Sequence, residues 1–336
     1  MSGVDNSTVS VGVLGCADIA ARRVLPAFAT APGAEITAIA SRSADKARAL
    51  AARFTADPVE GYQRLLDRAD VDAVYLPLPS GLHAEWIERA LRAGKHVLAE
   101  KPLTTSPEDT SALQRLAADL GLVLEENFMF RHHGQHAVVR ALLDEGVVGR
   151  PRAFSAAFAI PSRPRGDIRY QAELGGGALL DVAGYPVAAA QLLFGPDWRV
   201  EGAFLKHEPE FGVDVAGTAL LSTPAGPAAT LIFGLEHHYG SRYEIWGDAG
   251  RLAVDHVFTT PAAHRPVVRI ERADHQEERV LPAEDQVSNA VRAFLRAVRR
   301  GSAHGTRATG VQADLLEAIR HAARPVSSAP HVEKQT

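Results

Sequence analysis

The sequence predicts two domains: an N-terminal Rossmann domain with a doubly wound parallel α/β sheet, and a C-terminal α+β domain with a large, open, mixed and mostly antiparallel sheet. The first third of the 336 residues alternates short β-branched apolar runs with amphipathic runs, which is the pattern of βαβ units. From about residue 130, apolar and polar residues alternate between turn residues instead. The length is roughly twice that of a common domain. We therefore divide the chain into residues 1–128 and 129–336.

Five strands of the first domain are predicted by nearly continuous apolar character, as expected for buried parallel strands. They span residues 9–15, 35–41, 72–79, 96–101 and 122–128. Helical runs separate them, and Ser106 followed by Pro107 begins one of these with an N-cap residue and a first-turn proline. Pro26, in the helix after the first strand, predicts a kink or break there.

In the second part, helices are predicted at residues 136–145, 178–194, 284–300 and 311–323. The helix 178–194 is followed by Gly195 and Pro196, the usual order of residues at a helix end. Strands are predicted at residues 151–160, 213–222, 228–235, 242–246 and 251–255. Turn residues at 224–226 and 247–250 predict hairpins. These strands form the predicted mixed sheet.

Composition excludes several classes of protein. The net charge of -4 gives no basic field to hold a phosphate backbone, so we expect no nucleic-acid partner. Cys16 is the single cysteine, which excludes an intrachain disulfide and a cysteine-rich zinc site. Residues 1–10 are polar, and no run approaches eighteen uninterrupted apolar residues. We therefore expect a soluble, cytoplasmic protein with no membrane partner.

The first predicted strand leads directly into the turn Gly15-Cys16-Ala17-Asp18-Ile19-Ala20 and then a helix. This is the context of the G-x-G-x-x-G/A dinucleotide motif, with alanine at its second and third glycine positions. The first glycine permits the tight turn, and the small second residue lets backbone amides approach a pyrophosphate. We expect cofactor contacts at this turn; the alternative is a turn that only connects a strand to a helix. The predicted contacts are Gly15, Cys16, Ala17, Asp18 and Ile19.

The second predicted strand ends without the acid that usually holds the ribose hydroxyls of NAD. Its end reads Ala40-Ser41-Arg42-Ser43, with Lys46 one turn later. Arg42, Ser41, Ser43 and Lys46 are able to bind a 2′-phosphate through charge-assisted hydrogen bonds, which favours NADP(H) over NAD. The alternative is that Arg42 and Lys46 belong to a solvated helix start.

Several short motifs occur together in this chain. They are the turn 15–20, Leu78-Pro79-Ser80 with His83, Ala99-Glu100-Lys101-Pro102, and Gly175-Gly176-Gly177 followed by Asp181. With these motifs the chain resembles the Gfo/Idh/MocA oxidoreductases over nearly its whole length. The resemblance implies the two-domain fold, a cis peptide at Pro102, and a homodimer or homotetramer formed through the C-terminal sheet. It also implies cofactor contacts at Leu78, Pro79, His83, Glu100 and Lys101.

Lys101 lies beside the nicotinamide and the substrate oxygen in the arrangement that this resemblance implies. Reduction of a ketone by hydride transfer develops negative charge on the oxygen, so a nearby cation stabilises the transition state and supplies a proton. Desolvation of the ammonium predicts a lowered pKa for Lys101.

Tyr185 stands where the family commonly has a histidine, four residues after Asp181. On a helix these two positions share one face, so both side chains are able to reach one substrate. A tyrosine, with a pKa of about 10, does not shuttle protons near pH 7 but does donate a hydrogen bond to a carbonyl. Asp181 would bind a substrate hydroxyl or orient Lys101. The alternative for Tyr185 is a core residue with its hydroxyl at the edge.

Tyr185, the turn at Gly15 and its continuation through residues 22–27 resemble the nucleotide-sugar 3-ketoreductase branch of the family. That resemblance implies NADPH-dependent reduction of the C3 keto group of a dTDP-3,4-diketo-2,6-dideoxyhexose, in deoxysugar biosynthesis for a glycosylated natural product such as an antibiotic. The alternatives are a dehydrogenase or reductase of a free sugar, a cyclitol or a small aldehyde, and a non-enzymatic NADP-binding regulator.

Substrate contacts are predicted at Lys101, Asp181 and Tyr185 and at three further residues, Asn127, Arg131 and Arg163. Further candidates to hold a diphosphate are Arg165, Arg169, His132, His133 and His136. Each loop arginine has the alternative of lying in a solvated loop. No metal is predicted, because the histidines lack an acidic partner at ligand spacing and hydride transfer needs none.

Overall fold

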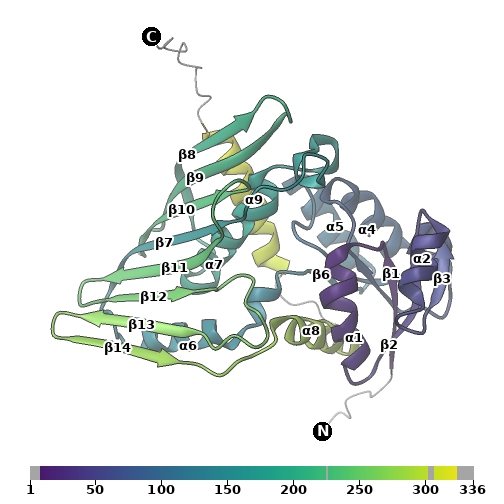
Figure 1. Ribbon diagram of the computed structural model, residues 1–336, viewed down its shortest axis with the longest axis horizontal. Coiled ribbons are helices and arrows are strands. Elements are labelled where there is room, and N and C mark those ends of the chain that lie inside the picture. The colour runs from purple at the N-terminus through teal and green to yellow at the C-terminus, as the bar shows by residue number, and fades with distance from the viewer. Residues whose placement is uncertain (1–7, 225, 302–305, 324–336) are drawn as a thin grey trace.

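The computed structural model describes residues 8–224, 226–301 and 306–323 and contains two sheets that lie side by side (Figure 1). The N-terminal sheet has six strands in the order β3-β2-β1-β4-β5-β6, and every pair in it is parallel. This is the predicted doubly wound Rossmann arrangement. Its strands are β1 (Val9–Leu14), β2 (Ala34–Ser41), β3 (Asp57–Glu60), β4 (Ala73–Leu76), β5 (His96–Ala99) and β6 (Leu124–Glu126).

The helices of this domain follow the predicted alternation. They are α1 (Leu25–Thr30), α2 (Ala44–Ala51), α3 (Tyr62–Leu66), α4 (His83–Arg92) and α5 (Pro107–Asp119). Ser106 caps α5 by accepting a hydrogen bond from the Asp109 amide, as its sequence predicts. A π-helical turn (Ala20–Val24) precedes α1, and Pro26 lies in the first turn of α1, so the helix changes from π to α just before the proline although its residues stay helical throughout.

The C-terminal sheet has eight strands in the order β14-β13-β12-β11-β7-β10-β9-β8. Only the β7–β10 pair is parallel, so the predicted mixed and mostly antiparallel sheet is confirmed. Both predicted hairpins connect neighbouring antiparallel strands, although Ala225 in the first lies outside the described residues. The strands are β7 (Pro151–Ala159), β8 (Arg199–Glu208), β9 (Val213–Ser222), β10 (Ala228–Gly234), β11 (Gly240–Gly247), β12 (Arg251–Asp255), β13 (Val267–Arg272) and β14 (His275–Val280).

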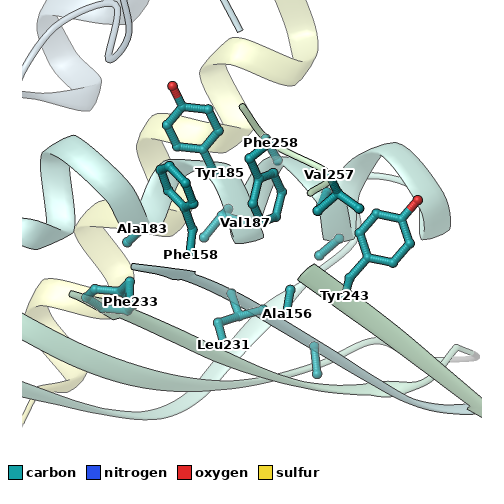
Figure 2. Packing of buried hydrophobic residues seen from close by; sticks show 14 of the residues in the cluster. Ala156, Phe158, Ala183, Tyr185, Val187, Leu231, Phe233, Tyr243, Val257 and Phe258 are labelled. Atoms are coloured by element: carbon teal, nitrogen blue, oxygen red, sulfur yellow. The ribbon is translucent and has the colours of Figure 1, made fainter. Parts of the chain in front are cut away.

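One face of this sheet is packed and the other is open. Helices α6 (Gly134–Asp144), α7 (Gly184–Phe194) and α9 (Thr306–Ala322) contribute buried residues to the core of this domain or pack against its strands. Figure 2 shows Tyr185, Phe158 and Phe258 packed together above the strands. Large apolar side chains remain exposed on strands of the other face, including Phe204, Leu220, Ile232 and Trp246.

The predicted helix 178–194 begins with a π-helical turn (Leu179–Ala183) before α7. Among the described residues, the stretch Ala172–Phe194 is the one helical segment long and apolar enough to cross a membrane by length and composition alone. In this structure 72% of its most apolar window is buried inside the protein, so the stretch forms a core helix of the fold.

Helix α8 (Gln286–Arg300) returns from the second sheet to the first domain. Its apolar residues Val287, Val291, Phe294 and Leu295 belong to the same buried cluster as strand β1 and helix α1. The division of the chain between residues 128 and 129 stays a prediction.

Candidate active site

A cavity of about 1150 Å³ lies at the carboxyl ends of β1, β2, β4 and β5 and continues beneath the second domain. Its volume exceeds the roughly 300–1,000 Å³ of ordinary small-molecule pockets. Most of the predicted site residues line it: Gly15, Cys16, Ala17, Asp18, Ile19, Ser41, Arg42, Ser43, Lys46, Leu78, Pro79, Glu100, Lys101, Arg163, Asp181 and Tyr185.

Gly15 gives the first strand its turn toward this cavity. Its φ is +122°, a region that L side chains rarely adopt, and an added Cβ would lie 3.0 Å from Leu78 Cδ2. The Gly15 amide donates to the Ala40 carbonyl at 2.9 Å, which ties the turn to the end of β2. A side chain at position 15 would be strained and would crowd Leu78, so glycine provides the bare backbone that a pyrophosphate requires at such a turn.

The end of β2 presents cations and hydroxyls to the same cavity. Arg42 and Lys46 are exposed side chains, whereas Ser41 is buried. The Ser43 hydroxyl accepts from the Lys46 amide at 3.4 Å as the N-cap of α2. Tyr62 also lines this part of the cavity, and burial raises the pKa of its phenol although the nearby Arg42 opposes that rise. The arrangement provides several donors for a phosphate.

Lys101 and Asp181 form an ion pair at the other end of the cavity. Lys101 follows β5, and its peptide bond to Pro102 is cis as predicted. The Lys101 Nζ donates to Asp181 Oδ1 and to the Asp181 backbone carbonyl, both at 2.7 Å. Only 13% of the Lys101 side chain and 18% of the Asp181 side chain are exposed. The two domains therefore meet at this pair.

The predicted lowering of the Lys101 pKa is wrong. Burial does lower the pKa of this ammonium, but Asp181 and Tyr185 raise it, and the result lies above the usual value for lysine. Orientation of Lys101 was one of the two roles expected for Asp181, but the expected pKa took account of desolvation alone. In this environment Lys101 holds its proton near neutral pH.

The second oxygen of Asp181 is held by Arg169. Arg169, in the short helix η4 (Ile168–Tyr170), donates from Nε to Asp181 Oδ2 at 2.7 Å and from Nη1 to Asp167 Oδ1 at 3.0 Å. Burial alone would raise the pKa of Asp181, but Lys101 and Arg169 lower it to about 2. Asp181 is thus a carboxylate between two cations. The Arg169 guanidinium, predicted as a candidate for a diphosphate, is directed at these two carboxylates.

The three consecutive glycines place this loop. The Gly177 amide donates to the Arg169 carbonyl at 2.9 Å, and a Cβ on Gly176 would lie 2.6 Å from that carbonyl oxygen. Gly175 has a φ of +77° and lies against Ser80, whose hydroxyl donates to the Gly175 carbonyl at 3.0 Å. Only glycines permit this approach, which brings Arg169 next to the helix that carries Asp181.

Tyr185 packs against aromatic rings and beside the lysine. Its ring lies 4.5 Å from that of Phe158 and 5.3 Å from that of Phe128, measured between centroids. The Lys101 Nζ lies 5.3 Å from the Tyr185 ring centroid, and in Figure 2 the tyrosine hydroxyl points away from the sheet. Burial raises the pKa of Tyr185 to about 12, although Lys101 lowers it. Tyr185 is therefore a protonated donor at the cavity wall.

Three predicted site residues do not line the cavity and so do not face a ligand bound there: His83, Asn127 and Arg131. His83 is fully buried, with its ring nitrogens 2.8 Å from the Leu78 carbonyl and 2.9 Å from the Pro102 carbonyl. Asn127 Nδ2 donates to Glu100 Oε1 at 2.8 Å.

Arg131 lies over the Phe128 ring, where burial lowers the pKa of its guanidinium and Glu126 opposes that change. All three residues thus support cavity residues from behind, because their side chains point into the protein.

The predicted histidine candidates also lie elsewhere. His136 is buried and its Nδ1 lies 3.0 Å from the Tyr243 hydroxyl, while His133 Nδ1 accepts from the Gln135 amide. Within the described ranges no group of three or more histidine, cysteine or acidic side chains is arranged to hold a metal.

Sequence reasoning missed several cavity residues, among them Tyr62, Phe258, Thr259 and Gln286. They come from distant segments and carry no local motif, so only the fold brings them together.

The chain matches two family models. Residues 9–128 match the oxidoreductase family with an NAD-binding Rossmann fold, and residues 136–253 match the GFO/IDH/MocA C-terminal domain.

Among curated relatives, the chain is 54% identical over 320 residues to the dTDP-3,4-didehydro-2,6-dideoxy-alpha-D-glucose 3-reductase of Actinomadura kijaniata, covering 95% of this chain and 96% of that protein. The enzyme of the same name from Streptomyces violaceoruber is 54% identical over 327 residues, with 94% and 96% covered. A D-xylose 1-dehydrogenase (NADP(+)) of Haloferax volcanii is 35% identical over 298 residues, with 86% and 89% covered.

Among solved structures, the chain is similar to a 3-ketoreductase from Actinomadura kijaniata in complex with NADP and TDP-benzene, with a TM-score of 0.93 and 54% identity over 95% of this chain and 98% of that one. Further structures of that ketoreductase carry a substitution of one lysine or of one tyrosine.

Proposed function

The chain belongs to the Gfo/Idh/MocA oxidoreductase family, and from this premise we propose that it reduces the C3 keto group of a dTDP-3,4-diketo-2,6-dideoxyhexose with NADPH. The observation that carries the proposal is the Lys101 ammonium beside the Tyr185 ring, both lining one cavity with the Gly15 turn. The reductases that share 54% of their residues with this chain act on that class of sugar by name. The reaction belongs to deoxysugar biosynthesis for a glycosylated natural product, such as an antibiotic.

The cavity residues fit NADP(H). The Gly15 turn leaves room for a pyrophosphate, and a Cβ at this position would narrow that space. Arg42, Lys46 and the hydroxyls of Ser41 and Ser43 would hold a 2′-phosphate. The remaining predicted contacts, from Leu78 to Lys101, would border the nicotinamide. Bound NADPH would supply the hydride that reduces the ketone. The solved ketoreductase relative contains NADP, which supports this choice of cofactor.

Lys101 and Tyr185 would stabilise and protonate the ketone oxygen during the reduction. As C3 accepts a hydride, its oxygen becomes an alkoxide, and an ammonium at hydrogen-bond distance stabilises that charge, the more so because Lys101 is largely buried. The raised pKa values of Lys101 and Tyr185 keep both groups protonated, so each is a donor to the developing alkoxide. One of them gives its proton to that oxygen. Asp181 fixes the Lys101 ammonium in place through Oδ1.

The residues behind the cavity hold its wall. Glu100 accepts from the Tyr75 hydroxyl at 2.7 Å and from Asn127, and burial raises the pKa of its carboxyl. We assign Asn127, Arg131 and His83 to this support rather than to ligand contact. Of the candidates for the diphosphate we favour Arg163, because it lines both the main cavity and a neighbouring one of about 310 Å³, whereas Arg169, which also lines the main cavity, is bound to two carboxylates.

The test is transfer of deuterium from labelled NADPH, with labelled NADH in parallel, to a dTDP-3,4-diketo-2,6-dideoxyhexose made in situ by its upstream dehydratases. Label at C3 with NADPH strongly preferred is the expected result. Efficient turnover of a free sugar while dTDP-sugars are ignored would contradict the substrate, and the 35% identity with a D-xylose dehydrogenase makes that the second candidate. NADPH binding with no turnover of any sugar would instead indicate a regulator.

We also propose that the protein is a cytoplasmic homodimer or homotetramer. The open face of the C-terminal sheet exposes Phe204, Leu220, Ile232 and Trp246 at 42% to 54% of their surface, and burial of such a face stabilises an assembly. Light scattering at micromolar concentration measures the assembly directly, and a monomer would contradict it.

A further inference from the structure

We propose that Arg169 is a positioning residue for the reduction, which holds the Asp181 carboxylate so that Lys101 stays directed at the substrate oxygen and keeps an exchangeable proton. The inference rests on the proposed ketone reduction and extends it to a residue outside the lysine, aspartate and tyrosine of the predicted set. The carrying observation is the chain of contacts from Asp167 through Arg169 and Asp181 to Lys101.

The first step of the argument is geometric. A carboxylate bound at one oxygen is free to rotate, whereas Asp181 is bound at both: Oδ1 by Lys101 and Oδ2 by Arg169, each at 2.7 Å. Arg169 is in turn fixed, because its Nη1 donates to Asp167 and its carbonyl accepts from the Gly177 amide. A planar guanidinium holds its donors in a rigid fork, whereas the donors of a lysine ammonium rotate about a flexible stem. The position of the Lys101 ammonium is thus set by an element of the other domain.

The second step is electrostatic. Asp181 alone against a buried ammonium would hold the proton of Lys101 strongly, which opposes its transfer to an alkoxide. Arg169 shares the negative charge of Asp181 and repels the ammonium, so it lowers the pKa of Lys101 relative to a simple ion pair.

The other groups that face Lys101 are Tyr185 on α7, Glu100 beside it, Glu126 on β6 and His83 on α4. None of these four groups contacts Asp181 Oδ2. Arg169 is therefore the group that competes with Lys101 for the negative charge of the Asp181 carboxylate.

Burial separates Arg169 from an arginine that only binds a substrate anion. Its side chain is 30% exposed, against 77% for Arg165 in the same loop, whose partner is Glu210 at the surface. An arginine with two carboxylates on its donors has little charge to offer a diphosphate. Arg169 therefore acts through Asp181.

The first experiment compares steady-state kinetics of Arg169→Gln, Arg169→Lys and the matched control Arg152→Gln, which removes an exposed arginine that pairs with Asp248 and lines neither cavity. In Arg169→Gln we expect kcat to fall about 10- to 100-fold while the KM values for NADPH and the nucleotide sugar change little, as expected for lost positioning. Arg169→Lys recovers part of the loss because it keeps the charge without the fork, and Arg152→Gln equals the wild type. A higher KM for the sugar at unchanged kcat would overturn the proposal and indicate an anion contact.

The second experiment needs no substrate. Competitive acetylation of the full chain between pH 8 and 10, quantified on the Lys101 peptide with the exposed Lys206 as reference, measures the fraction of neutral Lys101 amine. Arg169→Gln raises the pKa of Lys101, so acetylation becomes several-fold slower; Asp181→Asn lowers it, so acetylation becomes faster. A purely structural role would accelerate labelling in both variants. Equal rates in wild type and Arg169→Gln would overturn the proposal.

The two experiments separate this inference from the proposed function. If the wild type reduces no dTDP-sugar but the labelling rates change in opposite directions, the proposed function fails and the role of Arg169 toward Lys101 stands. If Arg169→Gln does not fold, Arg169→Lys decides: wild-type labelling with reduced kcat supports the proposal, and wild-type kcat overturns it. The double variant Arg169→Gln with Asp181→Asn is expected to lose no more kcat than Asp181→Asn alone.

Discussion

Two groups of charges in this protein use the same residue types in opposite surroundings. The network of Lys101, Asp181 and Arg169 lies between the domains, with 13% to 30% of each side chain exposed. A ladder of arginines and acids crosses β11 to β14, where Arg269 pairs with Asp255 at 2.6 Å and both side chains are about half exposed. The distances are alike. The two groups differ in the exposed fraction of their side chains, so contact geometry alone does not identify a functional ion pair. Burial determines how much free energy is lost when one charge is left without its partner.

The largest expected effect is on catalysis at the buried network. Lys101→Ala removes the cation that stabilises the developing alkoxide, so kcat is expected to fall about 10²- to 10³-fold. NADPH affinity, measured by quenching of tryptophan fluorescence, changes only a few-fold. Turnover equal to the wild type would show that the buried pair serves stability alone and would break the comparison.

The next largest effect is expected on the pH dependence of the free energy of unfolding, which distinguishes the buried network from the exposed ion pairs of the sheet. Asp181 has a pKa of about 2 in the folded protein against an ordinary 3.8, so its interactions stabilise the fold above pH 4 and are lost as the pH falls through about 2. The contribution is about 2 kcal/mol. The difference in free energy of unfolding between wild type and Asp181→Asn is therefore expected to shrink as the pH falls from 5 to 2, measured by urea unfolding. A constant difference would contradict the assignment.

Arg42 is the intermediate case, an exposed charge that lines the cavity. Its charge contributes to the binding free energy only when a 2′-phosphate contacts it and removes it from water. Arg42→Ala is expected to weaken NADPH binding about 10- to 100-fold and to leave NADH binding unchanged, by isothermal titration. Equal losses for both cofactors would place Arg42 at the adenine or pyrophosphate instead.

Tyr185→Phe removes one neutral donor and leaves the aromatic packing. We expect kcat to fall about tenfold, the contribution of a single hydrogen bond. Since the pKa of Tyr185 is about 12, the hydroxyl stays protonated and the ratio of the two rates should be constant between pH 6 and 9. A ratio that varies over this range would show that Tyr185 titrates in the working enzyme.

The smallest effect is expected on the sheet. Arg269→Ala removes contacts to Asp255 and Glu278 at an exposed site, so the free energy of unfolding should change by less than about 0.5 kcal/mol. Urea unfolding at low and high salt tests this. A loss of several kcal/mol in the free energy of unfolding would show that an assembly buries these ion pairs. That result would support the proposed oligomer and would say nothing about the active site.

The sequence predicted the elements whose hydrophobic pattern is strong. The strands at 213–222 and 251–255 match β9 and β12 residue for residue. Strand β3 (Asp57–Glu60) was missed because two of its four residues are acidic, one is proline and three are exposed, and β14 was missed because charged residues dominate it. Such edge strands receive their structure from a neighbouring strand rather than from their own apolar residues.

The predicted site residues that a motif fixes on the backbone line the cavity, whereas side-chain direction keeps others away from it. The Gly15 turn and Lys101 line the cavity as predicted, since a strand end determines where they lie. Asn127 and Arg131 follow a strand end in the same way, yet their side chains point into the protein. Arg169 was singled out only as one of three loop arginines, because nothing near it in the sequence indicates the carboxylate of Asp181.

Helix α8 has a consequence for how the chain is made. Its apolar residues complete the core beside β1 and α1, yet it is synthesised about 160 residues after the last strand of that sheet. At the usual 5–20 residues per second, roughly 10 to 30 seconds pass on the ribosome before this helix arrives. Throughout that time the apolar surface that later receives Phe294 faces the solvent and the chaperones of the cell. Folding of the first domain is therefore completed by a segment that is made long after the last strand of its sheet.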